Sequence, residues 1–511
     1  RWQVGDRVSI TMGMRADVLA IRGNAPYNAE VDSIFGRRTD AMPRRRIHLS
    51  PRLGFTWDVS DAGLDQLRGG IGIFAGRPPL AWFHTSLRSH GVGVGVLRCG
   101  SSPNDFGLPP PFDPDHRSAP TECASGVGLT TAPRGDVDLL DRDLGMARTL
   151  RASLAYDRQL PWGLIATGEA LATRILSDFV FVNLNLEGPQ AMDRYGRVLY
   201  GSIASTGLAN PVVRSAFSEV IDLRNTSQNH AVQLTARLEK RFSDGVSALA
   251  AYSFSRVRDV QTPIRVNNPG IVNWSSRAVS GRHDDLDPEI SLNDIPHRIV
   301  LAGTYRAPWR WGTEFSFYYV GESGGPFTYR SWGGGRRGDL NADGSNANDP
   351  IYVPRDAFDP DEITFSGRSD APDADNSPAA QAERVEVQQG AFERLIEGTE
   401  CLRRQRGRIL ERNSCREPWS HTTIAAVRQP IPIGSGALEL ELEAFNLLNL
   451  LNGDWGRYRV AAPALLEHVA QTPGSPDESV PVFRFDATAP KWTTLTTESA
   501  FQLQLAARYR F

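Results

Sequence analysis

The connections between the predicted strands of this chain constrain its fold most strongly, because they alternate between short and long. Period-two alternation of apolar and polar residues predicts twelve strands. They cover approximately residues 7–19, 47–58, 66–76, 146–158, 164–185, 230–243, 246–259, 297–308, 312–330, 419–432, 437–454 and 500–511. The short connections are 59–65, 159–163, 243–245, 308–311 and 433–436, and the long ones are 20–46, 77–145, 186–229, 260–296, 331–418 and 455–499. Tight periplasmic turns and long extracellular loops are typical of an all-β, antiparallel transmembrane barrel.

Individual strands support a barrel whose two faces meet different solvents. In 438–443, three leucines alternate with three glutamates. A row of carboxylates is costly against lipid but ordinary in a water-filled lumen. In 500–511, aromatic residues stand at both ends of the apolar row, at Phe501 and Phe511, where an interfacial girdle lies in such barrels. The alternative is a large soluble β protein with one solvated face.

Composition excludes several other classes of protein. The chain has 511 residues and no apolar run of roughly 18 residues, which excludes a conventional membrane-spanning helix. Its net charge of −3 gives no electrostatic reason to expect a nucleic-acid partner. If Phe511 lies on the periplasmic side, counting back along the twelve strands places Arg1 there as well.

Several segments resemble the C-terminal half of TonB-dependent outer-membrane transporters, in particular the Oar-like branch with large barrels. The segments that carry the resemblance are PRLGFTWD (51–58), LRGGIGIFAGR (67–77), AYSFSRVRD (251–259), NDIPHRIVLAGTYRAP (293–308), GDLNADGSNANDPIYVPRD (338–356), CLRRQRGRILERNSCREPWSH (401–421) and LELELEAFNLLNLLNGDWG (438–456). The resemblance implies the outer membrane of a Gram-negative-type bacterium, a barrel of 22 strands, an N-terminal plug domain and a TonB-box segment that contacts the TonB complex. It also implies that the barrel assembly machinery recognises the C-terminal strand, which ends in an aromatic residue.

On this resemblance, residues 1–511 are the C-terminal barrel portion of a TonB-dependent receptor, and the plug domain lies outside them. The function implied is uptake of a saccharide, peptide or siderophore, with the ligand itself unidentified. Two alternatives stay open. The barrel could be a surface anchor for adhesion, or a passive pore without TonB gating. Closure of the predicted strands as a smaller barrel is a further option.

The four cysteines predict two disulfides within loops. Cys99 and Cys123 share the loop 77–145, and Cys401 and Cys415 share the loop 331–418. Neither pair has the CxxC spacing of a zinc site. An extracellular location is oxidising, so both pairs are expected to be bridged.

One loop has the spacing of a calcium site. The candidate ligands are Asp339, Asn341, Asp343, Ser345 and Asp349. The first three occupy positions 1, 3 and 5 of an EF-hand loop, Gly344 supplies the turn at position 6, and Ser345 offers its backbone carbonyl. Pro350 stands where a bidentate glutamate belongs, so Asn348 or Asp349 would have to substitute. The alternative is a solvated turn, and no other cofactor is expected.

The same long loop, 331–418, is predicted to contain one or two helices, because 377–412 lacks strand alternation and is rich in Ala, Glu, Gln and Arg. Aromatic and basic loop residues are candidate ligand contacts on composition alone. These residues are Trp82, Trp274, Tyr329, Arg330 and Trp332.

No set of residues predicts catalysis. The chain has neither an H-E-x-x-H pair nor a P-loop. Two clusters contain metal-ligating residue types, but such clusters are usually solvated loop tips. The clusters are His283, Asp284, Asp285 and Asp287, and Asp113, Asp115 and His116. The chain is therefore not expected to be an enzyme.

Overall fold

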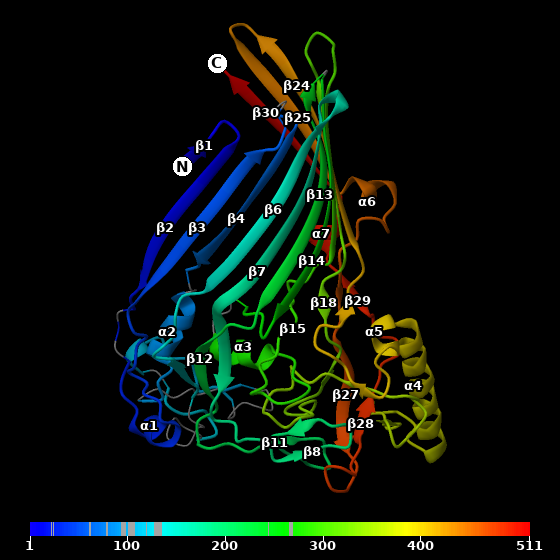
Figure 1. The fold of residues 1–511 in the computed structure, drawn as a ribbon. Helices are drawn as coiled ribbons and strands as arrows, with labels where there is room; N and C mark the ends of the chain where they lie inside the picture. Colours follow the sequence, from blue (N-terminus) through cyan, green and yellow to red (C-terminus); the bar gives the residue numbers. More distant parts are fainter. Residues whose placement is uncertain are drawn as a thin grey trace.

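The computed structural model describes residues 1–511 except 22, 24, 61–62, 78–79, 93–98, 101–107, 119, 127–134, 244 and 265–268, and it leaves the side chains of 116, 241–243 and 269 undescribed. The dominant element is one large antiparallel sheet whose strands follow each other in chain order (Figure 1). These strands are β1 (Trp2–Val4), β2 (Val8–Leu19), β3 (Arg46–Asp58), β4 (Asp65–Ala75), β6 (Arg148–Leu160), β7 (Leu164–Asn183), β13 (His230–Ser243), β14 (Val246–Asp259), β16 (His297–Arg306), β17 (Glu314–Glu322), β24 (Ser420–Ile433), β25 (Gly436–Phe445) and β30 (Gln502–Arg510). All twelve predicted strands are confirmed, and β1 is added to them.

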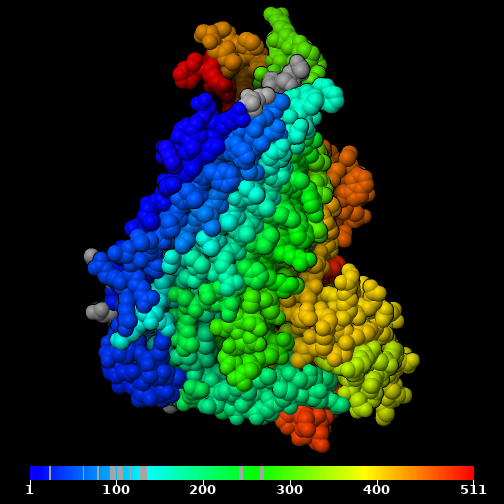
Figure 2. Space-filling view, in the orientation of Figure 1, coloured from blue at the N-terminus to red at the C-terminus, as the bar shows by residue number. Residues whose placement is uncertain are grey.

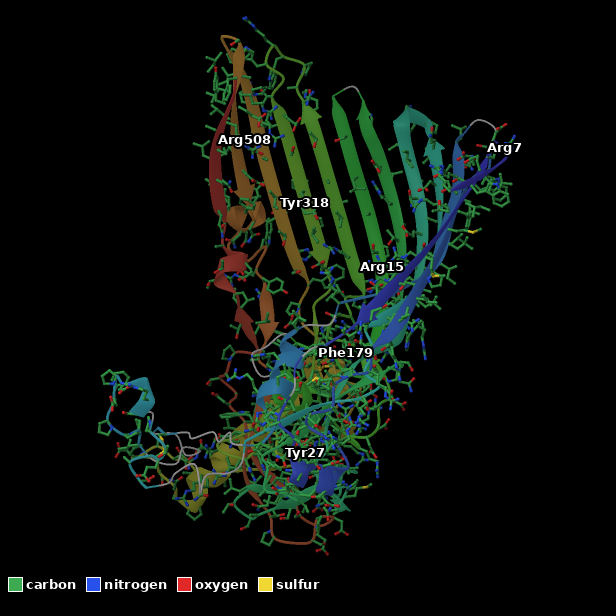
Figure 3. All side chains as sticks on the ribbon, turned by 90° about the vertical axis from the view of Figure 1, so that its left-hand side faces the viewer. Arg7, Arg15, Tyr27, Phe179, Tyr318 and Arg508 are labelled. Atoms are coloured by element: carbon green, nitrogen blue, oxygen red, sulfur yellow. A yellow bond between two sulfur atoms is a disulfide. The ribbon has the colours of Figure 1, made fainter. Side chains whose placement is uncertain are left out.

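The sheet is a trough rather than a closed barrel. Its strand order begins at β1 and ends at β30, and no ladder between described residues joins these two edges. Figure 3 shows the two edges standing apart, with Arg7 near one and Arg508 on the other. Backbone groups on both edges therefore lack strand partners within the described chain.

The two faces of the trough have opposite chemistry, as the alternation predicts. Leu442 pairs with Leu505 across β25 and β30, and both side chains are exposed, Leu505 by 76%. On the other face Arg428 lies opposite Glu441, with Nη2 2.8 Å from Oε1, and its Nη1 lies 3.2 Å from Oε1 of Glu314. An exposed apolar face suits lipid, and a face crossed by ion pairs suits a wet lumen.

Short and long connections segregate to opposite ends, which confirms the prediction from loop lengths. The tight turns, including the 3₁₀ turn η2 (Pro161–Gly163), lie at the upper end in Figure 1, together with both termini. The long connections, residues 20–45, 76–147, 184–229, 260–296, 323–419 and 446–501, gather mainly at the lower end, and we call them the cap. In Figure 2 the cap fills the lower end of the molecule, and α4 (Pro378–Gly398) bulges at its side.

The cap is a folded structure with hydrophobic cores of its own. One core gathers buried side chains from 327–485, including Phe392 of α4, and a second surrounds Trp82 and Trp274. The other helices are α1 (Ala29–Phe35), α2 (Leu80–Arg88), η1 (His116–Ser118), α3 (Pro269–Ser276), α5 (Glu400–Arg403), α6 (Leu447–Leu451) and α7 (Thr496–Ser499). The described helices include none that is both long and apolar enough to span a membrane. The pair α4 and α5 confirms the helical segment predicted within 377–412.

Short strands complete the cap and the lower part of the sheet. They are β5 (Val137–Leu140), β8 (Ala191–Met192), β9 (Val198–Leu199), β10 (Gly201–Ile203), β11 (Ala209–Pro211), β12 (Val220–Thr226), β15 (Glu289–Ile290), β18 (Pro326–Phe327), β19 (Arg330–Trp332), β20 (Tyr352–Val353), β21 (Thr364–Phe365), β22 (Arg408–Ile409), β23 (Cys415–Arg416), β26 (Arg459–Ala461), β27 (Ala464–Gln471), β28 (Pro481–Arg484) and β29 (Trp492–Thr494). β12 extends the sheet beyond β7 and pairs in parallel with β5. Both disulfides are present, Cys99–Cys123 and Cys401–Cys415, as predicted.

Two predicted strands end earlier than expected. The strand predicted over 312–330 ends at Glu322, and just beyond it Gly324 lies so close to the backbone of Glu417 that a Cβ atom would collide with its carbonyl oxygen. The strand predicted over 437–454 ends at Phe445, because Asn446 adopts a left-handed conformation with φ 50° and α6 follows.

Candidate functional site in the cap

The acidic loop, residues 339–349, lies buried in the cap and wraps around its own carboxylates. Asp339 accepts hydrogen bonds at Oδ1 from the amide of Asp343 (3.0 Å) and at Oδ2 from the amide of Gly344 (2.9 Å). Asp343 accepts at Oδ1 from the amide of Ser345 (2.7 Å). Positive φ angles at Ala342 (52°) and Gly344 (98°) permit this tight wrap. The loop therefore holds its first two carboxylates in fixed orientations.

Counter-charges for the acidic loop come from distant segments. Arg197 places Nη1 3.4 Å from Oδ1 of Asp349, and His283 places Nε2 2.7 Å from Oδ2 of Asp343. No described Lys, Arg or His lies within ion-pair distance of Asp339. All three carboxylates are buried, with 3% exposure or less. Two basic partners thus face three buried carboxylates, one of the partners being a histidine.

The shortage of positive charge around the acidic loop accompanies raised pKa values of two of its carboxylates. Burial and the neighbouring Asp343 carboxylate hold the pKa of Asp339 well above its usual range. Burial and Asp339 do the same to the pKa of Asp349. Two acceptor atoms at the end of the loop, Oδ2 of Asp349 and Oδ1 of Asn348, have no described hydrogen-bond partner although they are buried. Orphaned buried acceptors are uncommon and call for a missing partner such as water or an ion.

The five predicted calcium ligands are thus gathered in one buried loop. Among the described residues, no group of three or more His, Cys, Asp or Glu side chains is arranged to hold a metal ion. An EF-hand-type set differs from such a group because an amide and a backbone carbonyl supply some of its oxygens. The amide of Asn341 now turns Nδ2 toward Oδ2 of Asp343, at 3.0 Å. A half-turn of that amide would present its oxygen instead, with loss of the hydrogen bond that Oδ1 accepts from the backbone N–H of Asp343 at 3.0 Å.

A small pocket of about 190 Å³ adjoins the acidic loop. Asn348 and the preceding Ala347 form part of its wall. Three arginines from separate connections also line it, and its lining contains no acidic residue. They are Arg277 after α3, Arg330 in β19 and Arg412 before β23.

The predicted ligand contacts divide between core and surface. Trp82, Trp274 and Tyr329 are buried in the hydrophobic cores, so the interpretation of these three as ligand contacts is wrong. Composition could not distinguish a core aromatic from an exposed one. Trp332 is exposed and Arg330 lines the pocket, so both remain available for binding.

The two clusters of metal-ligating residue types, 283–287 and 113–116, do not form a group that could hold a metal ion among the described side chains. His283 turns to Asp343, whereas the neighbouring Asp284 pairs with Arg282 at the surface. Asp113 and Asp115 accept backbone hydrogen bonds, and the side chain of His116 lies outside the described residues. The link from His283 to the acidic loop spans 60 residues, and sequence spacing gave no signal for it.

A further motif escaped the sequence analysis. Gly321–Gly325 reads GESGG, which has the G-x-S-x-G spacing of a hydrolase nucleophile turn. In the structure this segment begins in the last two residues of β17 and is followed by the short strand β18 rather than a helix, and Ser323 Oγ accepts the backbone N–H of His297 at 3.1 Å. The strand-to-helix context that such a motif needs is therefore missing here.

Comparison with known proteins identifies the family. The sequence profile of a family described as "Outer membrane beta barrel domain" matches residues 1–454. The chain belongs to this outer-membrane β-barrel family. Its strands cross the outer membrane of a Gram-negative bacterium, with short periplasmic turns and a cap of extracellular loops. No curated protein sequence matches the chain significantly.

Three solved structures similar to this chain are outer-membrane transporters or receptors. One is the outer-membrane transporter YddB from Escherichia coli, with 8% identity and a TM-score of 0.41, covering 91% of this chain and 41% of that one. Another is the siderophore receptor PirA from Acinetobacter baumannii, with 10% identity and a TM-score of 0.40, covering 88% and 40%. A third is the FrpB iron transporter from Neisseria meningitidis, with 10% identity and a TM-score of 0.38, covering 88% and 39%. This chain spans about two fifths of the length of these structures.

Proposed function

We propose that this chain is the C-terminal barrel portion of a plugged, TonB-driven outer-membrane transporter of the Oar-like branch. The observation that carries the proposal is the open trough, capped at its extracellular end and lined by charged side chains. Unpaired edge strands in a bilayer leave backbone groups unsatisfied at several kcal/mol each, so further strands must complete the barrel. In this proposal those strands and the plug belong to the same polypeptide.

The proposed role is capture and uptake of a ligand rather than catalysis. The cap would bind a saccharide, peptide or siderophore, and the polar face of the trough would line its path. Movement of the plug by the TonB complex would open that path. The outward apolar row of β30 is the proposed contact of the barrel assembly machinery.

Conductance in a planar bilayer tests this function against its alternatives. A plugged transporter, purified intact from outer membranes, is expected to give no steady conductance. It is also expected to be retained on an immobilised C-terminal domain of TonB. Steady open channels without TonB retention would identify a passive pore. Neither conductance nor TonB retention would favour a surface anchor.

We also propose that the acidic loop binds Ca²⁺. Three buried carboxylates face too little positive charge, and the free acceptors Oδ2 of Asp349 and Oδ1 of Asn348 sit at the end of the loop. The residues that would hold the ion are Asp339, Asn341, Asp343, Asp349 and the carbonyl of Ser345. The bound ion would supply positive charge and fasten the loop, without chemistry of its own.

A further inference from the structure

We propose that the pocket beside the acidic loop binds an anionic oxygen-rich group of the ligand, such as a carboxylate or phosphate, through Arg277 and Arg330. This inference deepens the proposed receptor function and rests on it. Arginine is suited to this role because its guanidinium offers a planar fork of donors to oxyanions. The pocket is called the arginine pocket below.

Arg277 and Arg330 are the two arginines of the pocket without a salt bridge to a described residue, although the carboxylates of Glu289 and Asp285 lie near enough to Arg277 to favour its charged form. Neither lies within ion-pair distance of a carboxylate among the residues that the structure describes. Arg330 donates from Nη1 to the carbonyl of Ala347, and Arg277 donates from Nη2 to the carbonyl of His283 at 2.6 Å. Carbonyl oxygens orient a guanidinium but do not neutralise it. Both guanidinium groups are therefore held in place without a salt bridge to any described carboxylate.

The third arginine, Arg412, already has two carboxylate partners outside the lining of the pocket. Arg412 Nη2 lies 3.1 Å from Oδ1 of Asp259, and its Nε lies 3.2 Å from Oε2 of Glu289. It contributes positive potential to the arginine pocket without a free charge. Burial, and after it the nearby positive charge of Arg412, lowers the pKa of Arg277 to about 10. Burial also lowers the pKa of Arg330.

An anion would offset the cost of desolvating these groups. Buried charges in proteins are normally paired, because an unpaired one loses its hydration without compensation. Thr328 and Asn413 line the same pocket and add polar groups to its wall. Since pockets for whole drug-sized ligands measure about 300–1,000 Å³, a pocket of about 190 Å³ takes an acidic terminal group and leaves the rest of the ligand outside.

The test is protection of arginines against phenylglyoxal in the intact protein, purified in detergent with calcium present. Inorganic phosphate and acetate are compared with chloride at equal ionic strength, and modified residues are mapped by mass spectrometry. We expect saturable protection of Arg277 and Arg330, at least about tenfold in rate, which corresponds to about 1.4 kcal/mol. Arg404, which directly follows α5 and has a side chain that is 73% exposed, is expected to react at one rate in all salts.

The outcome distinguishes the chemistry of the bound group. Protection by phosphate alone indicates a phosphorylated ligand, and protection by acetate alone indicates a carboxylate. Equal reaction of Arg277 and Arg330 in all three salts, or equal protection of Arg404, would overturn the proposal. A failure of the transport function leaves this readout unchanged, because it is measured on purified protein without TonB.

Variants provide an independent check. Arg330→Gln is expected to raise the anion concentration that half-protects Arg277 at least about tenfold, whereas Arg404→Gln leaves it unchanged. Should Arg330→Gln disturb the acidic loop through the lost contact with Ala347, Arg277→Gln with Arg330 as the reporter replaces it. Unchanged protection in both variants would contradict the assignment.

Discussion

Arg197 and Asp349 form a buried ion pair 152 residues apart in sequence, with Nη1 3.4 Å from Oδ1. Arg197 also donates from Nη2 to the carbonyl of Pro350 at 2.6 Å. The pair ties the segment before β9 to the end of the acidic loop. It is the principal counter-charge in a part of the cap that holds three buried carboxylates.

Removal of this counter-charge is expected to destabilise the cap strongly. Arg197→Met leaves Asp349 buried and unpaired, which should cost about 3–5 kcal/mol. Arg282→Met, which breaks the exposed pair with Asp284, should cost below about 1 kcal/mol. Chemical unfolding followed by the fluorescence of the buried Trp82 and Trp274 measures both. Equal losses in the two variants would show that Arg197 is not a structural counter-charge.

Calcium removal should destabilise the wild type and have no effect on a variant that lacks one carboxylate of the acidic loop. In the wild type, chelation is expected to lower the unfolding midpoint of the cap, because an ion that binds only the folded state stabilises it by mass action. Asp339→Asn removes the carboxylate that has no ion-pair partner among the described residues. It should therefore raise stability without calcium and abolish the response to calcium.

Asn376→Asp, at an exposed position outside the acidic loop, is the control for a simple change of charge. It should keep the wild-type response to calcium. A chelator that leaves the wild-type midpoint unchanged, together with no binding of Tb³⁺ as a luminescent calcium analogue, would contradict the calcium proposal.

Acidification should destabilise the cap through His468. This side chain is fully buried, its Nδ1 accepts the backbone N–H of Gly338 at 3.4 Å, and burial lowers its pKa to about 4. The unfolded chain takes up a proton near pH 6.5 and the folded chain only near pH 4. The neutral imidazole thus contributes stability that is full above about pH 6.5 and is lost as pH falls toward 4, by up to about 3 kcal/mol.

The comparison of wild type with His468→Gln isolates this contribution, because Asp339 and Asp349 titrate in the opposite sense in both proteins. Unfolding free energies measured from pH 7 to pH 4 should fall more steeply in the wild type. The exposed His84→Gln variant should keep the wild-type slope. Parallel curves for wild type and His468→Gln would refute the role of this histidine.

The two faces of β25 should respond differently to the same new charge. Leu442→Arg places a guanidinium on the lipid face, at a cost of up to about 2–4 kcal/mol near the bilayer midplane. Glu443→Arg, on the adjacent lumen-facing position, should cost far less. Urea unfolding in lipid vesicles and the yield of assembled protein check the difference. Similar losses at both positions would contradict the assigned faces.

The alternation of apolar and polar residues predicted the sheet well, because each strand has one face toward lipid and the other toward water. Leucine and glutamate alternate in β25 because one face meets lipid and the other meets water, so the pattern is readable without any partner strand. Loop lengths then placed every long connection at one end. The ends of strands were less predictable, since Asn446 acts through its left-handed backbone and Gly324 lies against Glu417, a residue far away in sequence.

The cap was much less predictable, because its contacts join residues far apart in sequence. The parallel pairing of β12 with β5 connects two short apolar runs without alternation. The links from Arg197 and His283 to the acidic loop, and the meeting of Arg277 with Arg330, have no local signature. The spacing of the acidic loop was visible in sequence, whereas its burial and its shortage of counter-charge were not.

The mass of the polypeptide that carries this barrel portion in purified outer membranes tests the central proposal most directly. An antibody raised against α4 identifies the protein, and mass spectrometry of the purified species gives its length. The account predicts a single chain about twice 56.2 kDa, whose additional residues contain further alternating strands and a plug. A mature species of 56.2 kDa would contradict it, because the trough would then have to close without strands from the same polypeptide.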